Sequence, residues 1–253
     1  MAGGDRARGA LVKGVILAGG SGSRLSPLTR AVNKHLLPVG RKPMIYYPIE
    51  KLRSAGIDDI LVVTGTEHAG GVFQLLGSGS EFGCRFTYRV QDQAGGIAEA
   101  LGLAEHFADG EPFCAMLGDN LFADDFGPLA QRFVEFAGST RIWDARGMVL
   151  LSQVPDPSRF GVARFDNDKL VEIVEKPADP PSNWAVAGAY FYAGSEVFEI
   201  IRSLKASARG ELEISDLNNE ILCRGRLAHV KLTGWWSDAG TFPSLAHAQE
   251  LVR

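Results

Sequence analysis

The chain of 253 residues has few cysteines and no long apolar run, and both shortages exclude classes of protein. Cys84, Cys114 and Cys223 lie far apart and form no C-x-x-C pair, so we expect free thiols in a reducing compartment. No apolar stretch approaches the roughly 18 residues that cross a bilayer. Residues 1–13 lack the apolar core of a signal peptide. We therefore expect a cytoplasmic protein without a membrane partner, with a flexible tail over residues 1–13.

Excess positive charge is also missing. The 26 basic and 30 acidic residues give a formal charge of −4, whereas proteins that bind a nucleic-acid backbone usually carry a positive excess. Nucleic acid is therefore not an expected partner. The five histidines form no cluster with metal-ligand spacing, and no Ser-His-Asp or Cys-His arrangement is evident. Hydrophobic residues make up 45%, which excludes a disordered or fibrous chain.

Glycine, in contrast, is abundant, with 30 residues, and many glycines follow short apolar runs. In the first half, strands are expected over 15–18, 60–63, 84–90 and 113–117, and helices over 43–55, 68–76, 97–107 and 126–136. This alternation of strand and helix implies a parallel sheet covered on both faces. In the second half, strands are expected over 147–153, 161–165, 170–174, 186–192 and 227–232, and helices over 195–203, 212–222 and 242–252. The class is α/β.

The stretch from Val15 to Leu25 has the pattern of a buried strand, a glycine loop and then an arginine, Arg24. Ligands of open parallel sheets bind beyond the carboxyl ends of the strands, and glycines there let backbone N–H groups approach phosphates. The loop matches neither the Walker A motif nor the dinucleotide fingerprint, whose third glycine is replaced by Leu25. A tight turn with an exposed arginine would have the same sequence pattern.

Further charged residues fit a phosphate site. Arg24 and Lys34 flank a segment that can wrap around phosphate groups, although both could simply be solvated. Asp119 follows an apolar strand and Asp238 follows two tryptophans, so the two carboxylates could share one Mg²⁺. The Gly-Asp-Asn sequence at Asn120 is also a common turn signal. Spacing alone leaves open whether the aspartates meet.

Six segments together resemble the sugar-1-phosphate nucleotidylyltransferases, and within that family the short members that use dTTP and glucose 1-phosphate. In chain order these segments are 17–25, 34–38, 42–48, 117–120, 175–177 and 208–216. The resemblance extends from about Gly14 to the end of the sequence. It implies a Rossmann-like nucleotide-diphospho-sugar transferase fold, with a mostly parallel mixed sheet flanked by helices. It also implies one domain over 14–253, with a nucleotide-binding half at about 14–145 and a sugar-binding half at about 146–253.

The resemblance implies that dTTP and α-D-glucose 1-phosphate form dTDP-glucose and pyrophosphate with Mg²⁺, in a homo-oligomer that is usually a tetramer. Arg24, Lys34, Lys176 and Asp119 then match catalytic positions, and Asp119 and Asp238 match the metal ligands. Matches to nucleotide-binding positions are Leu17, Ala18, Gly19, Gly20, Ser21, Gly22, Ser23, Arg24, Gln91, Gly96 and Asp119. Matches to sugar-phosphate positions are Asn120, Gly161, Glu175, Lys176, Val186, Tyr190 and Arg209.

Several of these residues also fit roles that involve no ligand. Val186 and Tyr190 could be core residues, Gln91 a surface strand residue, and Glu175 and Lys176 a solvated ion pair. Ala94 and Gly95 stand where many family members have proline and aspartate beside the base, so UTP or another sugar 1-phosphate is an alternative substrate. A non-catalytic nucleotide-sugar sensor is an alternative of another class.

Overall fold

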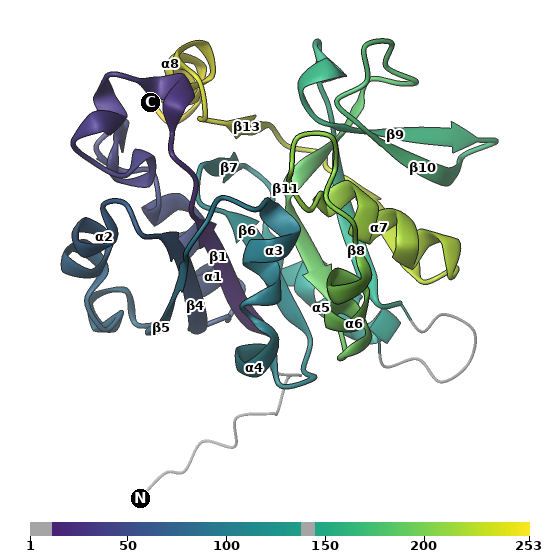
Figure 1. Ribbon diagram of the computed structural model, residues 1–253, viewed down its shortest axis with the longest axis horizontal. Coiled ribbons are helices and arrows are strands. Elements are labelled where there is room, and N and C mark those ends of the chain that lie inside the picture. The colour runs from purple at the N-terminus through teal and green to yellow at the C-terminus, as the bar shows by residue number, and fades with distance from the viewer. Residues whose placement is uncertain (1–11, 138–144) are drawn as a thin grey trace, which may run out of the picture.

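The computed structural model describes residues 12–137 and 145–253, so most of the expected tail over 1–13 lies outside the described residues. Within these ranges, a mixed sheet of nine strands has helices on both faces (Figure 1). The expected α/β fold with a mixed sheet is confirmed. No helix of the described ranges combines the length and the apolar character that crossing a membrane requires.

The first half forms the parallel part of the sheet, in the order β5-β4-β1-β6. Because the next strand along the chain, β6, pairs on the other side of β1, the strand order reverses between β1 and β6. A reversal of this kind opens a crevice at the carboxyl ends of the strands. The elements of this half are β1 (Lys13–Ala18), α1 (Tyr46–Ser54), β4 (Asp59–Gly65), α2 (Ala69–Leu76), β5 (Arg85–Gln91), α3 (Ile97–Gly102), α4 (Glu105–Ala108) and β6 (Phe113–Leu117).

The second half joins the first through β11, which runs antiparallel to β6 and to β8. Strands β9 and β10 form an antiparallel hairpin at one end of the sheet (Figure 1). Strand β12 pairs in parallel with β8. The elements of this half are α5 (Phe126–Ala137), β8 (Gly147–Gln153), β9 (Gly161–Asp166), β10 (Lys169–Glu175), β11 (Trp184–Tyr192), α6 (Glu196–Ser203), α7 (Ile214–Cys223), β12 (Leu227–Lys231) and α8 (Phe242–Leu251).

A pair of short strands at the carboxyl edge connects the halves. Strand β7 (Asn120–Phe122) pairs with β13 (Trp236–Asp238), which brings the segments of the two expected metal aspartates together. Strand β2 (Pro38–Val39) pairs with β3 (Lys42–Pro43). The 3-10 helices are η1 (Ser23–Leu25), η2 (Leu28–Arg30), η3 (Lys34–Leu36), η4 (Ser80–Phe82) and η5 (Pro157–Arg159).

The alternation of side chains in β1 divides the core between the two faces of the sheet. Val15 and Leu17 pack in one apolar cluster with residues of α3, α4, α6 and α7, whereas Ile16 and Ala18 pack in another with residues of α1, α2 and α5. All four side chains are buried, as expected for a parallel strand covered on both faces. The carboxyl edge of the sheet is therefore fixed from both sides.

Helix α1 begins later than expected. It starts at Tyr46, because Pro43 belongs to β3 and pairs with Pro38. Pro48 occupies the first turn of α1, where a missing N–H breaks no helical hydrogen bond. The proline that marks the helix start is therefore Pro48.

Two other expected helices also differ. The helix expected over 97–107 is divided into α3 and α4, with Leu103 and Ala104 between them. Helix α7 starts at Ile214 because the backbone of Leu212 bonds elsewhere: its N–H donates to Gly95 O at 2.7 Å and its carbonyl accepts from Ala98 N at 3.2 Å. This backbone pair links the second half of the chain to the start of α3.

Candidate functional site

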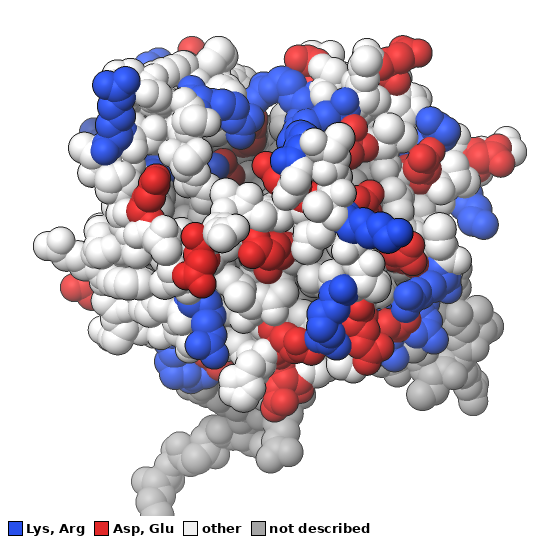
Figure 2. All heavy atoms as spheres, viewed as in Figure 1, with Lys and Arg blue, Asp and Glu red and all other residues white. Residues whose placement is uncertain are grey.

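A cavity of about 500 Å³ opens beyond the carboxyl ends of β1 and β6, where the strand order reverses. Its size suits a small-molecule ligand. Basic side chains gather around a hollow in the upper part of the molecule, with acidic ones between them (Figure 2). The charged residues that line the cavity are Arg24, Lys34, Asp119, Arg159, Glu175, Lys176, Arg209, Glu211, Glu213 and Asp238.

The glycine loop after β1 adopts conformations that other residues reach with strain. Gly20 and Gly22 have φ angles of 91° and 61°, and a Cβ on Gly22 would lie 2.8 Å from the Thr29 side chain. The Thr29 hydroxyl donates to Gly22 O at 2.9 Å and closes the loop. Of the residues expected here, Leu17, Gly19, Gly20 and Arg24 line the cavity. Ala18, Ser21, Gly22 and Ser23 are not among its lining residues, and Ser21 and Ser23 border a separate pocket.

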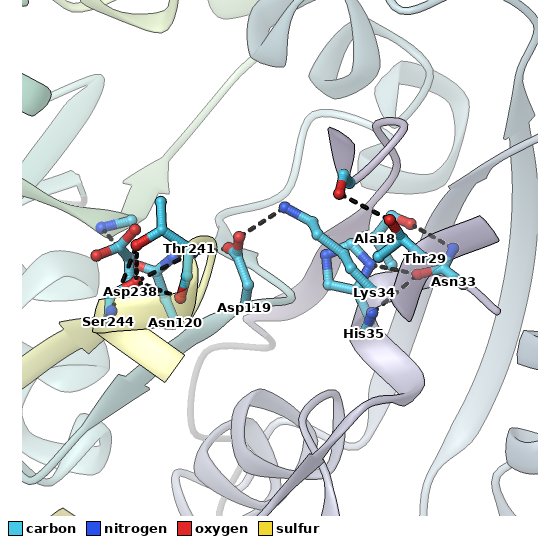
Figure 3. Close-up of polar contacts among 12 residues, drawn as sticks. Ala18, Thr29, Asn33, Lys34, His35, Asp119, Asn120, Asp238, Thr241 and Ser244 are labelled. Atoms are coloured by element: carbon cyan, nitrogen blue, oxygen red, sulfur yellow. Dashed lines mark hydrogen bonds and ion pairs between the residues drawn. The ribbon is translucent and has the colours of Figure 1, made fainter. Parts of the chain in front are cut away.

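Lys34 and Asp119 form a close ion pair in the cavity wall. Lys34 Nζ lies 2.6 Å from Asp119 Oδ2, and only 13% and 8% of the two side chains are exposed (Figure 3). Burial alone would raise the pKa of Asp119. The Lys34 charge and the hydrogen bonds from Lys34 and Asn120 outweigh it and hold the pKa of this carboxyl well below its usual range. Asp119 is therefore a carboxylate throughout the physiological pH range.

Asn33 and His35, the two neighbours of Lys34 in the chain, are linked to each other by hydrogen bonds. Asn33 Oδ1 accepts from the His35 backbone N–H at 3.0 Å and lies 2.7 Å from His35 Nδ1, while Asn33 Nδ2 donates to Ala18 O (Figure 3). Burial and the neighbouring Lys34 charge lower the pKa of His35 to about 3. A Cβ on Gly118 would lie 2.7 Å from the His35 ring, so only glycine fits there. The neutral imidazole thus packs against Gly118, directly before the Asp119 that pairs with Lys34.

Asp238 lies on the other side of the same wall. Its Oδ2 is 3.3 Å from Arg159 Nη2. Burial and the nearby Asp119 charge raise the pKa of Asp238, whereas Arg159 and Arg24 counteract part of this effect. A Cβ on Gly240 would lie 3.1 Å from Arg24 Nη2, 3.2 Å from Asp119 Oδ2 and 3.4 Å from Asp238 Oδ2. Two carboxylates and one guanidinium therefore converge on the space beside Gly240.

Asn120 holds the two short strands together. Its Oδ1 accepts from Trp236 Nε1 at 2.7 Å and from Gly188 N at 3.1 Å, and its Nδ2 donates to Asp119 Oδ1 at 2.9 Å. A Cβ on Gly188 would lie 2.4 Å from Asn120 Oδ1, so glycine is required there. Asn120, which was expected at the sugar phosphate, also lines the cavity, and its Nδ2 carries a second hydrogen besides the one given to Asp119.

The end of the cavity nearest β5 is lined by Gln91, Gly96 and Ile97. Gln91 is 6% exposed, and its Nε2 donates to Glu99 Oε2 at 2.7 Å. Gly96 has a φ of 104°, and a Cβ on it would lie 2.4 Å from Leu212 O. Backbone conformation and close packing both require glycine at this position.

Charged groups of the second half are tied into a network. Arg209 Nη2 lies 2.7 Å from Glu213 Oε2 and 3.3 Å from Glu175 Oε1. Glu175 also accepts from Ser215 Oγ at 2.5 Å and lies 3.4 Å from Lys176 Nζ. Lys176 has a φ of 42°, a left-handed conformation that few non-glycine residues adopt.

The remaining residues expected around the sugar lie on two neighbouring strands. Gly161, Val186 and Tyr190 all line the cavity. Val186 and Tyr190 are 7% and 4% exposed and also belong to the apolar core. Burial, followed by the charges of Glu175 and Asp119, raises the pKa of Tyr190, so its hydroxyl keeps its proton. The packing role and the cavity-lining role are therefore compatible.

Several cavity residues are absent from the sequence-based expectations. Arg159 follows Pro157 and Ser158, a pattern that indicates an exposed turn. Glu213 and Ser215 lie within the segment 208–216 that carries part of the resemblance, but only Arg209 of that segment was expected at the site. The alternating polarity of Glu211, Glu213 and Ser215 was the available signal.

The carboxylates of Asp119 and Asp238 fit a divalent cation such as Mg²⁺. Both oxygens border the same space beside Gly240, and carboxylate oxygens are ligands that Mg²⁺ prefers. No three His, Cys, Asp or Glu side chains of residues 12–137 and 145–253 form a larger metal-binding group. Mg²⁺ commonly takes one or two carboxylates and completes its shell with phosphate oxygens and water, so two ligands suffice.

A family model described as "Nucleotidyl transferase" matches residues 13–253. The glucose-1-phosphate thymidylyltransferase of Neisseria meningitidis is 46% identical over 96% of this chain and 83% of its own length. The enzyme of that name from Actinoplanes is 47% identical over 96% and 78%.

Two solved structures are also similar to this chain. A Bacillus anthracis chain assigned as a glucose-1-phosphate thymidylyltransferase, in complex with a sucrose, superposes with a TM-score of 0.89 at 53% identity, covering 96% of this chain and 95% of that one. A UDP-glucose pyrophosphorylase complexed with UDP-glucose superposes with a TM-score of 0.81 at 26% identity, covering 96% and 98%.

Proposed function

Since the chain belongs to the nucleotidyl transferase family, we propose that it transfers a thymidylyl group from dTTP to glucose 1-phosphate and releases pyrophosphate. The family indicated by the sequence motifs is thereby confirmed. The choice of dTTP and glucose 1-phosphate rests on the relatives that are 42–47% identical and bear that enzyme name.

The observation that carries the proposal is the convergence of Arg24, Asp119 and Asp238 beside Gly240, at the mouth of the glycine loop. Two phosphate esters repel each other, so the reaction needs charge stabilisation and alignment rather than a covalent intermediate. Arg24 can donate a fork of hydrogen bonds to the phosphates of dTTP. Lys34 has three N–H donors and gives one to Asp119, which leaves donors for the departing pyrophosphate.

We assign the sugar phosphate to the second half of the cavity. Lys176 is 44% exposed and lies beside Glu175, so its ammonium group can turn toward a phosphate. Arg209 can contribute charge but is held by Glu213 and Glu175. A glutamate accepts hydrogen bonds from sugar hydroxyls, and the protonated Tyr190 hydroxyl can donate or accept.

Mg²⁺ held by Asp119 and Asp238 would supply positive charge to phosphate oxygens as they approach each other. Neighbouring side chains of the protein hold both carboxylates in position for the ion. Asn120 fixes Asp119 through Oδ1, and Arg159 holds Asp238 in place. The cavity lining has five basic and five acidic side chains, so its formal charges cancel. A bound Mg²⁺ would add the positive charge that offsets a polyphosphate.

The decisive experiment is a substrate panel. Purified protein with Mg²⁺ is expected to release pyrophosphate only when an NTP and a sugar 1-phosphate are both present, and fastest with dTTP and glucose 1-phosphate. A higher kcat/KM with UTP, or with another sugar phosphate, would redirect the assignment within the same chemistry. Protein that binds these ligands but releases no pyrophosphate with any pair would favour the sensor.

The proposal includes a cytoplasmic location and an oligomer, a tetramer by family resemblance. The three cysteines Cys84, Cys114 and Cys223 are free, in keeping with a reducing compartment. Light scattering of the purified chain would measure its mass in solution against the 27.2 kDa of one copy.

A further inference from the structure

The amide of Gln91 has a fixed orientation at the end of the cavity nearest β5. Its Nε2 donates to Glu99 Oε2 at 2.7 Å and to the backbone oxygen of Gly96 at 3.4 Å. A backbone carbonyl and a carboxylate oxygen both accept hydrogen bonds. Both partners therefore require the NH₂ group, and not the oxygen, on their side of Gln91.

The oxygen of the same amide faces the opposite direction. Gln91 Oε1 lies 3.0 Å from where a Cβ on Gly19 would be, in the wall that also contains Gly20 and Gly96. Because Gly19 has no side chain, this acceptor is not covered from the loop. The cavity thus meets an acceptor at Gln91, while the donors of that amide are engaged with Glu99 and Gly96.

Glu99 can take this position only because residue 95 is glycine. A Cβ on Gly95 would lie 2.0 Å from Glu99 Oε2 and 2.6 Å from its carboxyl carbon. The carboxylate of Glu99, which projects from the first turn of α3, fills the space beside Gly95. Gly95 and Glu99 therefore form one unit that holds Gln91, at the position where the sequence departs from many family members.

We infer that Glu99 is a positioning residue that turns the Gln91 amide so that its oxygen accepts the N3–H of a pyrimidine. The inference rests on the proposed function for the presence of a base at Gln91. Thymine and uracil carry a hydrogen on N3, whereas N3 of cytosine is itself an acceptor. Glu99 thereby makes the site selective for thymine and uracil over cytosine, because an acceptor facing an acceptor leaves both unpaired.

The test compares Glu99→Gln with Glu105→Gln. An amide at position 99 can donate as well as accept, so only the longer bond to Gly96 O, at 3.4 Å, still favours the original orientation, and Gln91 can turn over and offer NH₂ to cytosine. We expect Glu99→Gln to lower the ratio of kcat/KM for dTTP to that for dCTP at least about tenfold, the effect of one hydrogen bond. The KM for glucose 1-phosphate stays unchanged. Glu105 pairs with Arg202 on the surface, so Glu105→Gln keeps the wild-type ratio.

Gly95→Ala acts on the same amide through a different residue, since a methyl group at position 95 overlaps the Glu99 carboxylate and displaces it. It is expected to lower the dTTP to dCTP ratio like Glu99→Gln, and the double variant is expected to show no further loss. A wild-type ratio in both single variants, with folded protein by circular dichroism, would overturn the inference. Wild-type protein that does not distinguish dTTP from dCTP would overturn it as well.

Equilibrium binding of dTTP and dCTP, measured by calorimetry, separates this inference from the proposed function. If wild-type protein binds dTTP more tightly than dCTP but releases no pyrophosphate, the proposed function fails. The binding ratio in Glu99→Gln then still tests Glu99. If pyrophosphate is released and the ratio does not change in the variants, only the inference fails.

Discussion

The two halves of the sheet bring charge to the cavity in different ways. In the parallel half, polar groups follow the ends of strands, and each has few partners: Asp119 follows β6 and is paired with Lys34. In the antiparallel half, Arg209 contacts three glutamates, Glu175, Glu211 and Glu213. The parallel half thus presents single groups that a ligand can engage, whereas the other half presents a network formed in advance. We therefore expect substitution of Asp119 to affect chemistry most, and substitutions in the network around Arg209 to affect binding most.

The largest expected effect is that of Asp119→Asn. It removes a carboxylate that is charged at every working pH and leaves Lys34 without its counter-charge. We expect kcat to fall by at least about 100-fold, as for other groups that act on developing charge. Pyrophosphate release measured over a Mg²⁺ series checks this, with Asp166→Asn at the exposed end of β9 as the control. An unchanged Mg²⁺ dependence in Asp119→Asn would contradict the assignment of Asp119 as a metal ligand. The parallel half would then lose its proposed role in the chemistry.

Lys176→Ala tests the other half. Loss of one charge-assisted hydrogen bond is expected to raise the KM for glucose 1-phosphate about 10- to 100-fold and to leave the KM for dTTP within about twofold. Initial rates with each substrate varied in turn measure both constants. The matched control is Arg164→Ala in the same hairpin, because Arg164 forms a surface ion pair with Glu172 and both side chains are half exposed. An equal rise in the KM for both substrates would mean that the two halves of the cavity do not each bind one substrate.

The smallest effect concerns stability and the buried histidine of the parallel half. The pKa of His35 is about 3 when folded and 6.5 when exposed. Between these values the unfolded chain binds a proton that the folded chain does not. The free energy of unfolding therefore falls as the pH drops from about 6.5 toward 3, by about 2 kcal/mol between pH 7 and pH 5.

Urea unfolding at pH 7 and pH 5 measures this contribution. The variant His35→Gln should lose this pH-dependent contribution to the free energy of unfolding. The control His247→Gln replaces an exposed histidine of α8 and should keep the pH dependence of the wild type. The pKa of His229 in the second half is also lowered, but this side chain is only half-buried, so His229→Gln should remove a smaller part. Identical pH dependence in wild type and His35→Gln would show that His35 is not held neutral by the fold.

Much of the parallel half could be predicted because local signals coincide with the fold. The apolar run at 15–18 ends in glycines, the run at 113–117 ends at Gly118 and Asp119, and ligands of such sheets bind where strands end. The resemblance added the partners in the second half. The start of α1 could not be predicted from Pro43, since pairing of β2 with β3 decides its conformation.

The contacts of Arg159 and Asn120 could not be predicted for a different reason. Arg159 reaches Asp238, 79 residues later, only because the hairpin of β9 and β10 is placed by β11. Asn120 is committed to Trp236 and Gly188, which are 116 and 68 residues distant. Nothing in the neighbouring sequence indicates partners so remote, and the side chain of asparagine serves equally well for ligands and for protein contacts.

The backbone pair between Leu212 and residues 95 and 98 makes the two substrate pockets inseparable for protein engineering. Any side chain at Gly96 would collide with Leu212 O, 2.4 Å from the new Cβ, and would shift the segment that leads back to Arg209. Under the proposed assignment of the two substrates, a designer who enlarges the base pocket at that glycine would therefore disturb recognition of the sugar phosphate too. Specificity for the two substrates is more safely altered through side chains, such as those at 91 and 186, than through this shared stretch of main chain.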